Sequence, residues 1–178
     1  MRMVYQPVGI LLGTLTFAAA TFATADESAS SDPMSRLSQF HQHQQTLGLL
    51  AQERADADEI SELAEEFAVD HGILEEWLNE AGHSSPPSDE SSTGYSAGEN
   101  EAYTTLQRQQ GAEFDSQFLA YQEDIHRQAL EYLEKNRPES IEQSEQANHL
   151  KVTHETLRRH LGMLQNQRQE GDNPSSDE

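Results

Sequence analysis

Apolar residues recur every three or four positions along four long stretches of this 178-residue chain. Such spacing places side chains on one face of an α-helix, which turns once in about 3.6 residues. After residue 25 no run alternates β-branched and polar residues, so the sequence predicts no strands. A lone amphipathic helix is only marginally stable, because its stability comes mostly from packing the apolar face. We therefore expect an all-α fold, an antiparallel four-helix bundle.

Start and stop signals divide the chain into helices and connections. The bundle is expected to span residues 33–170, with helices at 33–54, 56–82, 99–136 and 138–170. Pro33 suits the first position of a helix, and Asp56 and Glu59 have the spacing of a capping box. Gly82 is typical of a helix C-terminus, whereas Gly111 is expected only to loosen the third helix.

The remaining segments of the mature chain are expected to lie outside the packed core. Residues 83–98, rich in serine, proline and glycine, should form a disordered linker between two helical hairpins. Residues 26–32 are expected to be a flexible lead, and residues 171–178 a disordered acidic tail. The linker would let the second hairpin dock on the first by crossing over the end of the bundle.

Residues 1–25 have the layout of a secretory signal peptide. Arg2 precedes an uncharged, mostly apolar run, and Ala23-Thr24-Ala25 supplies the small residues of a cleavage site. An uncleaved anchor is the alternative, because the run is barely long enough to span a bilayer. We expect cleavage, periplasmic localisation and no membrane span afterwards. The chain has no cysteine, which excludes disulfides, thiolate metal sites and a lipid anchor.

The formal net charge is −21, and all 32 acidic residues follow residue 25. Phosphate backbones and anionic membrane surfaces would repel such a chain, so nucleic acid is excluded as a partner. The sequence contains no glycine-rich phosphate loop and no nucleophile elbow. These features favour a non-catalytic protein with an unidentified envelope partner or small ligand.

Three of the four stretches carry a histidine on or beside the apolar face: His71, His126 and His160. Each must be hydrogen-bonded, metal-bound or half exposed, since burying an unpaired polar group costs roughly 1–3 kcal/mol. Three imidazoles from three helices can hold Zn²⁺ or Cu²⁺, which makes these residues candidate ligands of a divalent metal ion. The alternative is a structural polar layer, in which the histidines satisfy one another or nearby backbone and carboxylate groups.

Carboxylates at helical spacing are candidates to support these ligands. Glu75 follows His71 by four residues, and Glu123 precedes His126 by three. Asp70 is adjacent to His71 and should face elsewhere.

Other residues compete for places in such a site. Glu53 could point inward from the first helix, and His154 lies nearer the centre of the last apolar face than His160 does. His154 is therefore a rival for the third inward position. His41 and His43 cannot share an ion within a helix, because residues two apart diverge by about 200°.

Three short motifs together resemble one family of exported bacterial proteins. They are Phe67-Ala68-Val69-Asp70-His71 preceded by residues 50–55, residues 111–115 followed by Asp124-Ile125-His126, and Leu157-Arg158-Arg159-His160-Leu161. The similarity covers nearly all of residues 35–168. The family is domain of unknown function 4142, often labelled a predicted outer membrane protein. The resemblance implies a ferritin-like bundle in the cell envelope and implies no activity.

A ferritin-like di-iron site needs inward glutamates on two helices and a Glu-x-x-His pair on each of the other two. Glu123 and His126 have that spacing, but an alanine and a leucine stand three residues before His71 and His160. Three functions are therefore considered in this order: an exported binding or stress-protection protein, a metal-binding protein, and a di-iron enzyme.

Overall fold

The structure is a computed structural model, and it describes residues 33–83, 97–136 and 144–172. Within these ranges the chain is helical and has no strand, which confirms the all-α class. The helices are α1 (Pro33–Arg54), α2 (Asp58–Glu80), α3 (Ala97–Leu106), α4 (Gly111–Lys135) and α5 (Glu145–Asp172). The bounds of α1 and α2 agree closely with the first two predicted segments.

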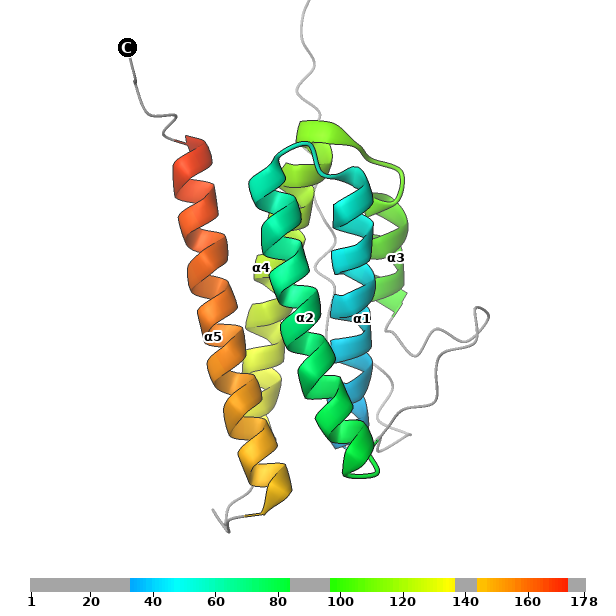
Figure 1. Cartoon of the computed structure of the whole chain (residues 1–178), viewed down its shortest axis with the longest axis vertical. Coiled ribbons are helices and arrows are strands. Elements are labelled where there is room, and N and C mark those ends of the chain that lie inside the picture. The colour runs from blue at the N-terminus through cyan, green and yellow to red at the C-terminus, as the bar shows by residue number, and fades with distance from the viewer. Residues whose placement is uncertain (1–32, 84–96, 137–143, 173–178) are drawn as a thin grey trace, which may run out of the picture.

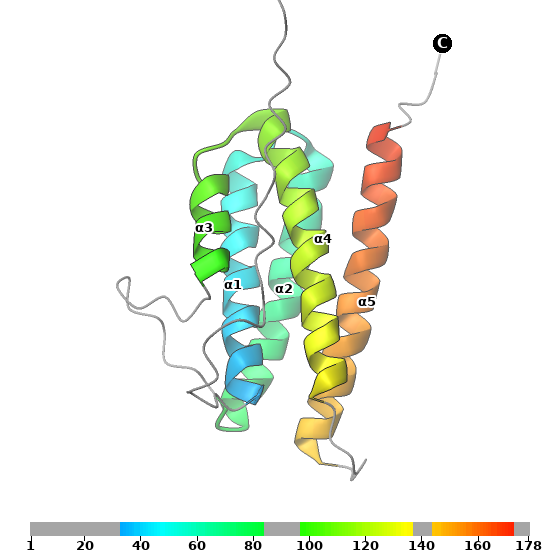
Figure 2. The ribbon, with the colours of Figure 1, turned by 180° about the vertical axis from the view of Figure 1, so that it is seen from behind.

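The four long helices lie side by side, and the short α3 lies beside α1 (Figure 1; Figure 2). α1 and α2 form one antiparallel pair, and α4 and α5 form a second. α2 also packs against α5, and α1 against α4. Because each long helix contacts two others, side chains from all four can meet in the centre.

The prediction of one helix over residues 99–136 is wrong. α3 ends at Leu106, whose carbonyl accepts a hydrogen bond from the backbone N–H of Gln109 as the chain turns. Gly111 then begins α4 with a φ of +66°, in the left-handed region that glycine adopts without steric cost. The chain reverses there, so α3 runs antiparallel to α4 (Figure 1) and buries Ala102 and Leu106 in the core.

The start of α2 also differs from the prediction. No side-chain cap forms at Ala57, the residue before the helix, so the capping box expected from Asp56 and Glu59 is wrong. Instead the Asp115 carboxylate of α4 accepts hydrogen bonds from the backbone N–H groups of Asp56 at 3.1 Å and Ala57 at 3.0 Å. A tertiary contact thus replaces the local one and ties the α1–α2 turn to the start of α4.

α5 continues to Asp172, so residues 171 and 172 belong to this helix and not to the predicted tail. Several predicted features lie outside the described residues: the signal peptide, the lead at 26–32, most of the linker at 83–98, the start of the helix predicted at 138–170, and the rest of the tail. No described helix combines the length and the apolar composition that a membrane span requires.

Apolar side chains from all five helices form one main core. Its fully buried members include Leu37, Phe40, Leu47, Phe114, Phe118 and Leu157. A second, smaller cluster lies between α2 and α5 and consists of Leu63, Phe67 and Leu164, with Leu161 packed against it.

α1 and α2 approach each other closely at Gly48. A Cβ atom at this position would lie 2.5 Å from the Cβ of Ala68 and 2.8 Å from the backbone oxygen of Ala64. Small residues on both helices therefore let the two backbones pack tightly, about one to two helical turns from the contact between His41 and His71.

Candidate metal centre

Four histidines, one from each long helix, meet in the centre of the molecule. His41 lies on α1, His71 on α2, His126 on α4 and His160 on α5, and all four are 0% exposed. We call this set the histidine cluster. Its ring centroids lie 5.0 Å apart for His41 and His71, 5.2 Å for His71 and His160, and 5.3 Å for His126 and His160. The fold thus places the three histidines that the sequence predicts as ligands at the same level along the helix axes.

Two phenylalanines enclose the cluster. The Phe40 ring meets the His71 ring edge-on at a centroid distance of 5.2 Å, and the Phe67 ring stacks on His160 at 4.1 Å. Apolar walls of this kind exclude water and lower the local dielectric constant, which strengthens every electrostatic interaction inside.

Burial sets the protonation state of the cluster. It lowers the pKa of His41 and His71 well below the ordinary histidine value, and neighbouring histidines lower it further. Burial, with His160 nearby, lowers the pKa of His126 to about 3. Burial also lowers the pKa of His160, against the opposing effect of its hydrogen bond to Asp70. The four rings are therefore neutral at pH 7, which is the form that binds metal ions.

Hydrogen-bond partners fix the position of the proton on His126 and His160. Nδ1 of His126 lies 2.8 Å from the backbone oxygen of Gln122, which can only accept, so Nδ1 carries the proton. Nε2 of His160 lies 2.8 Å from Oδ2 of Asp70, so Nε2 donates to that carboxylate. In neutral rings, Nε2 of His126 and Nδ1 of His160 must therefore hold lone pairs.

These two lone pairs face each other. Nε2 of His126 and Nδ1 of His160 are 3.1 Å apart, and neither ring has a proton left to join them. Facing lone pairs repel in a low-dielectric core, and a cation bound by both would remove the repulsion. Two imidazole nitrogens on one tetrahedral Zn²⁺ lie roughly 3.3 Å apart, given Zn–N bonds of about 2.0–2.1 Å. The observed separation is close to that of two ligands of one ion.

His71 supplies the third nitrogen. One nitrogen from each of His71, His126 and His160 lies within 4.8 Å of the others, in the part of the chain that the structure describes. Closing this set to tetrahedral ligand spacing requires side-chain movements of about 1.5 Å or less. Nδ1 of His71 lies 2.8 Å from Nδ1 of His41, so one of these two atoms donates to the other. When His71 donates, its Nε2 keeps the lone pair that a metal ion needs.

The glutamate expected to support His71 serves a different contact. Glu75 is buried, and its carboxylate accepts hydrogen bonds from Ser38 Oγ at 2.8 Å and from Gln42 Nε2 at 2.7 Å. Burial raises the pKa of Glu75, while these hydrogen bonds act in the opposite direction. Glu75 therefore joins α1 to α2 beside the histidine cluster and is not hydrogen-bonded to His71.

The other predicted supporting residues also lie outside the cluster. Glu123 pairs with Arg127 and Arg168, and Glu53 is exposed on α1. His154, the rival of the third ligand, keeps 31% of its side chain exposed. Among the described residues, the group placed to hold an ion thus contains three histidines and no carboxylate, so the di-iron ligand pattern does not assemble.

His41 is a member of the cluster that the sequence analysis misses. Along the sequence His41 stands out only beside His43, and the two do diverge, since Nε2 of His43 lies 2.9 Å from the hydroxyl of Tyr121. The available signal was the four-residue spacing from Leu37, which places His41 on the buried face of α1.

Asp70 is a second residue whose role the sequence analysis misses. It faces away from His71, as predicted, but toward α5, where it accepts from His160 and pairs with Arg159. Arg159 also lies 3.5 Å from Glu66. Neighbouring residues on α2 can both face packed helices because α2 contacts α1 on one side and α5 on another.

The fold and this site define an all-helical protein with a buried cluster of neutral histidines at its centre. The chain belongs to the family described as Domain of unknown function (DUF4142), which matches residues 16–166. The family resemblance of the three sequence motifs is thereby confirmed. No curated protein and no solved structure matches the chain. The function of the cluster is therefore argued from its own geometry.

Proposed function

We propose that this protein binds one divalent metal ion, of the Zn²⁺ or Cu²⁺ type, through His71, His126 and His160. The observation that carries the proposal is the 3.1 Å approach of two unprotonated nitrogens, on His126 and His160, in a fully buried site. Without a cation this approach is unfavourable, whereas two ligands of one ion require it.

Hydrogen bonds around the three ligand rings support the proposal. The second nitrogen of each ring has a partner: the backbone oxygen of Gln122, the Asp70 carboxylate or the His41 ring. Such bonds orient metal-binding imidazoles, fix their tautomers and raise their basicity. The arrangement of Asp70, His160 and the ion would be the carboxylate–histidine–metal triad common in metal sites.

The ligand type favours particular ions. Imidazole nitrogens suit Zn²⁺ and Cu²⁺, while Mg²⁺ and Ca²⁺ prefer oxygen ligands. Three protein ligands would leave one position of a tetrahedral ion for a water molecule or for another side chain. Because Phe40 and Phe67 wall the site, a substrate would have to displace aromatic rings, and we favour non-catalytic binding over catalysis.

The setting of the site is part of the proposal. Two antiparallel helix pairs, α1–α2 and α4–α5, joined by a long connection that contains α3, favour a ferritin-like bundle with one crossover. The signal-peptide layout of residues 1–25 favours export to the periplasm. In the envelope, a protein of this kind would act in metal binding or stress protection.

Metal analysis tests the proposal. The mature chain, prepared without a histidine tag, is incubated with Zn²⁺ or Cu²⁺ and dialysed. We expect one ion per chain in the unaltered protein and in the control His154→Ala. In His126→Ala we expect affinity at least about 100-fold weaker, because a ligand is lost. Circular dichroism checks that each variant keeps its helices.

Three results would contradict the proposal. A chain that takes up no ion under replete conditions would favour the structural polar layer, with the histidines satisfied by one another and by a shared proton. Two ions per chain with oxygen consumption would favour a di-iron enzyme. Binding that His126→Ala leaves unchanged would place the ion elsewhere.

A further inference from the structure

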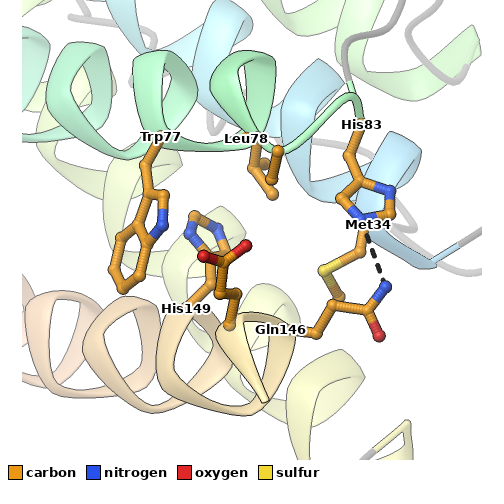
Figure 3. A pocket seen from close by; sticks show the side chains of 8 residues that line it. Met34, Trp77, Leu78, His83, Gln146 and His149 are labelled. Atoms are coloured by element: carbon orange, nitrogen blue, oxygen red, sulfur yellow. Dashed lines mark hydrogen bonds between the residues drawn. The ribbon is translucent and has the colours of Figure 1, made fainter.

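The histidine cluster is fully buried, so an ion has to reach it through other side chains. A small pocket lies where the end of α2 meets the start of α5 (Figure 3). Met34, Trp77, His83 and His149 are among its lining residues. Its volume of about 10 Å³ has room for one water-sized group.

The pocket runs from a solvent-exposed rim to a buried floor. At the rim, His83 is half-buried and lies 3.1 Å from the side-chain nitrogen of Gln146, a contact drawn in Figure 3. At the floor, Met34 and His149 are 5% and 2% exposed. The pocket thus joins a thioether and two imidazoles, both ligand types that bind first-row transition metals.

His149 links the pocket to the histidine cluster. Its ring lies 5.7 Å from the His41 ring, which in turn lies 5.0 Å from the His71 ring. These centroid distances are like the 5.3 Å between His126 and His160, whose nearest nitrogens are 3.1 Å apart. The line of rings from His149 through His41 to His71 is therefore as closely spaced as the rings of the centre itself.

Each ring on the line also has a buried nitrogen without a hydrogen-bond partner among the described residues. These atoms are Nδ1 of His149, Nε2 of His41 and Nε2 of His71. Buried polar atoms are almost always paired, so three such atoms in successive rings need an explanation. The hydrogen bond between Nδ1 of His41 and Nδ1 of His71 leaves a lone pair on only one of their two Nε2 atoms. A transiently bound ion would be a partner for that atom and for Nδ1 of His149.

We propose that this pocket is the access site for the metal ion, and that His149 and His41 pass the ion to the three-histidine centre. This inference rests on the proposed function. Transfer occurs by ligand exchange: a bond to the next nitrogen forms before the bond to the preceding one breaks. The oxidation state of the ion does not change. His41 binds through Nδ1, whose lone pair becomes available when its hydrogen bond to His71 breaks, so each neutral ring keeps its single proton as it rotates.

Binding kinetics test the route in the mature chain. Co²⁺ serves as the probe, because its visible absorption reports ligation by imidazole; association is followed by stopped flow and release by competition with a chelator. In His149→Phe, which keeps an aromatic ring beside Trp77, we expect both rate constants to fall about ten-fold or more with the dissociation constant unchanged. The matched control is His154→Phe, on the same helix outside the pocket, and it should leave both rates unaltered. His83→Ala, at the half-buried rim, should slow association in the same direction.

The outcomes separate the route from the proposed function. Unaltered affinity with normal rates in both His149→Phe and His83→Ala would overturn the route alone and place access elsewhere, such as beside Asp70. A weaker dissociation constant caused by faster release in His149→Phe would also overturn it, because His149 would then act as a ligand or a structural residue. Absence of Co²⁺, Zn²⁺ and Cu²⁺ binding by the unaltered chain would overturn the proposed function and the route with it.

Discussion

At the residue scale, the candidate centre depends on which nitrogen of each imidazole carries the proton. A neutral histidine has one donor and one lone pair, and the partner of the donor decides where the lone pair points. The backbone oxygen of Gln122 and the Asp70 carboxylate take the donors of His126 and His160. Both lone pairs consequently point inward, and this geometry differs from that of an ordinary hydrogen-bonded pair of histidines and supports the proposed metal site.

Asp70→Asn tests the role of the outer hydrogen bonds. We expect metal affinity to fall about 10–100-fold, because a neutral amide holds His160 less firmly and makes it less basic. Isothermal titration of Zn²⁺ measures the change. Glu66→Gln is the matched control, since Glu66 pairs with Arg159 as Asp70 does but is not hydrogen-bonded to His160. Equal effects of the two substitutions would show that metal affinity depends on the ion pairs with Arg159 and not on the hydrogen bond between Asp70 and His160.

At the element scale, small residues decide how closely the helices approach. Gly48 lets α1 lie against Ala64 and Ala68 of α2, and this pairing places His41 within hydrogen-bond distance of His71. Tight packing of this kind is sensitive to a single added methyl group, because protein cores are filled almost completely.

Substitution of two helical glycines by alanine tests this packing. Gly48→Ala should lower the free energy of unfolding by about 1–3 kcal/mol, since the new Cβ would meet backbone and Cβ atoms of α2. Gly162→Ala, on α5 with nothing within 4 Å of the new Cβ, should raise it by about 0.5–1 kcal/mol through helix propensity. Urea denaturation measures both. A stabilised Gly48→Ala protein would show that the close approach is absent in solution.

The sequence predicts helix positions correctly where local signals determine them. It does not predict them where contacts between distant residues determine them. The apolar periodicity predicts α1 and α2 closely. Gly111 could be recognised as a weak point, but whether a glycine loosens a helix or reverses the chain depends on what the next segment packs against. The cap of α2 was likewise unpredictable, because its acceptor, Asp115, comes from a helix that begins more than fifty residues later.

At the scale of the whole molecule, the histidine cluster and the acidic surface respond to acid in opposite directions. The net charge of −21 means that protonation of carboxylates relieves repulsion as the pH falls. Protonation of the buried histidines, by contrast, is possible only after unfolding or opening. Carboxylates titrate mostly near pH 4, so between pH 7 and 5 the histidines should dominate.

Acid sensitivity of the metal-free chain follows from this balance. The pKa of His126 is about 3 and that of His149 about 4 in the folded chain, against roughly 6.5 when unfolded. The unfolded chain therefore binds more protons below pH 6.5, so stability is full above that pH and decreases as the pH falls toward 4. We expect a loss of up to about 1.4 kcal/mol per pH unit for each such histidine, measured by urea denaturation between pH 7 and 5. Stability that stays constant or rises over this range would contradict the neutral, buried state of these rings.

The candidate site could be predicted in part. Helical spacing places His71, His126 and His160 at helix interfaces. Whether they lie at the same level depends on the axial position of each helix relative to its neighbours, which the spacing does not give. Helical spacing favours Glu75 and Glu123 as supporting residues. In the structure Glu75 instead pairs with α1, and Glu123 pairs with Arg127 of its own helix and Arg168 of α5. Local sequence shows which face a residue occupies and not which neighbour that face meets.

The central claim is that three imidazoles bind one ion in the middle of the protein. X-ray absorption spectroscopy of residues 26–178, loaded with one equivalent of Zn²⁺, tests this claim most directly. The account predicts a first shell of nitrogen at about 2.0–2.1 Å, with the outer-shell scattering of three imidazole rings. A shell made of oxygen alone, without imidazole scattering, would contradict it.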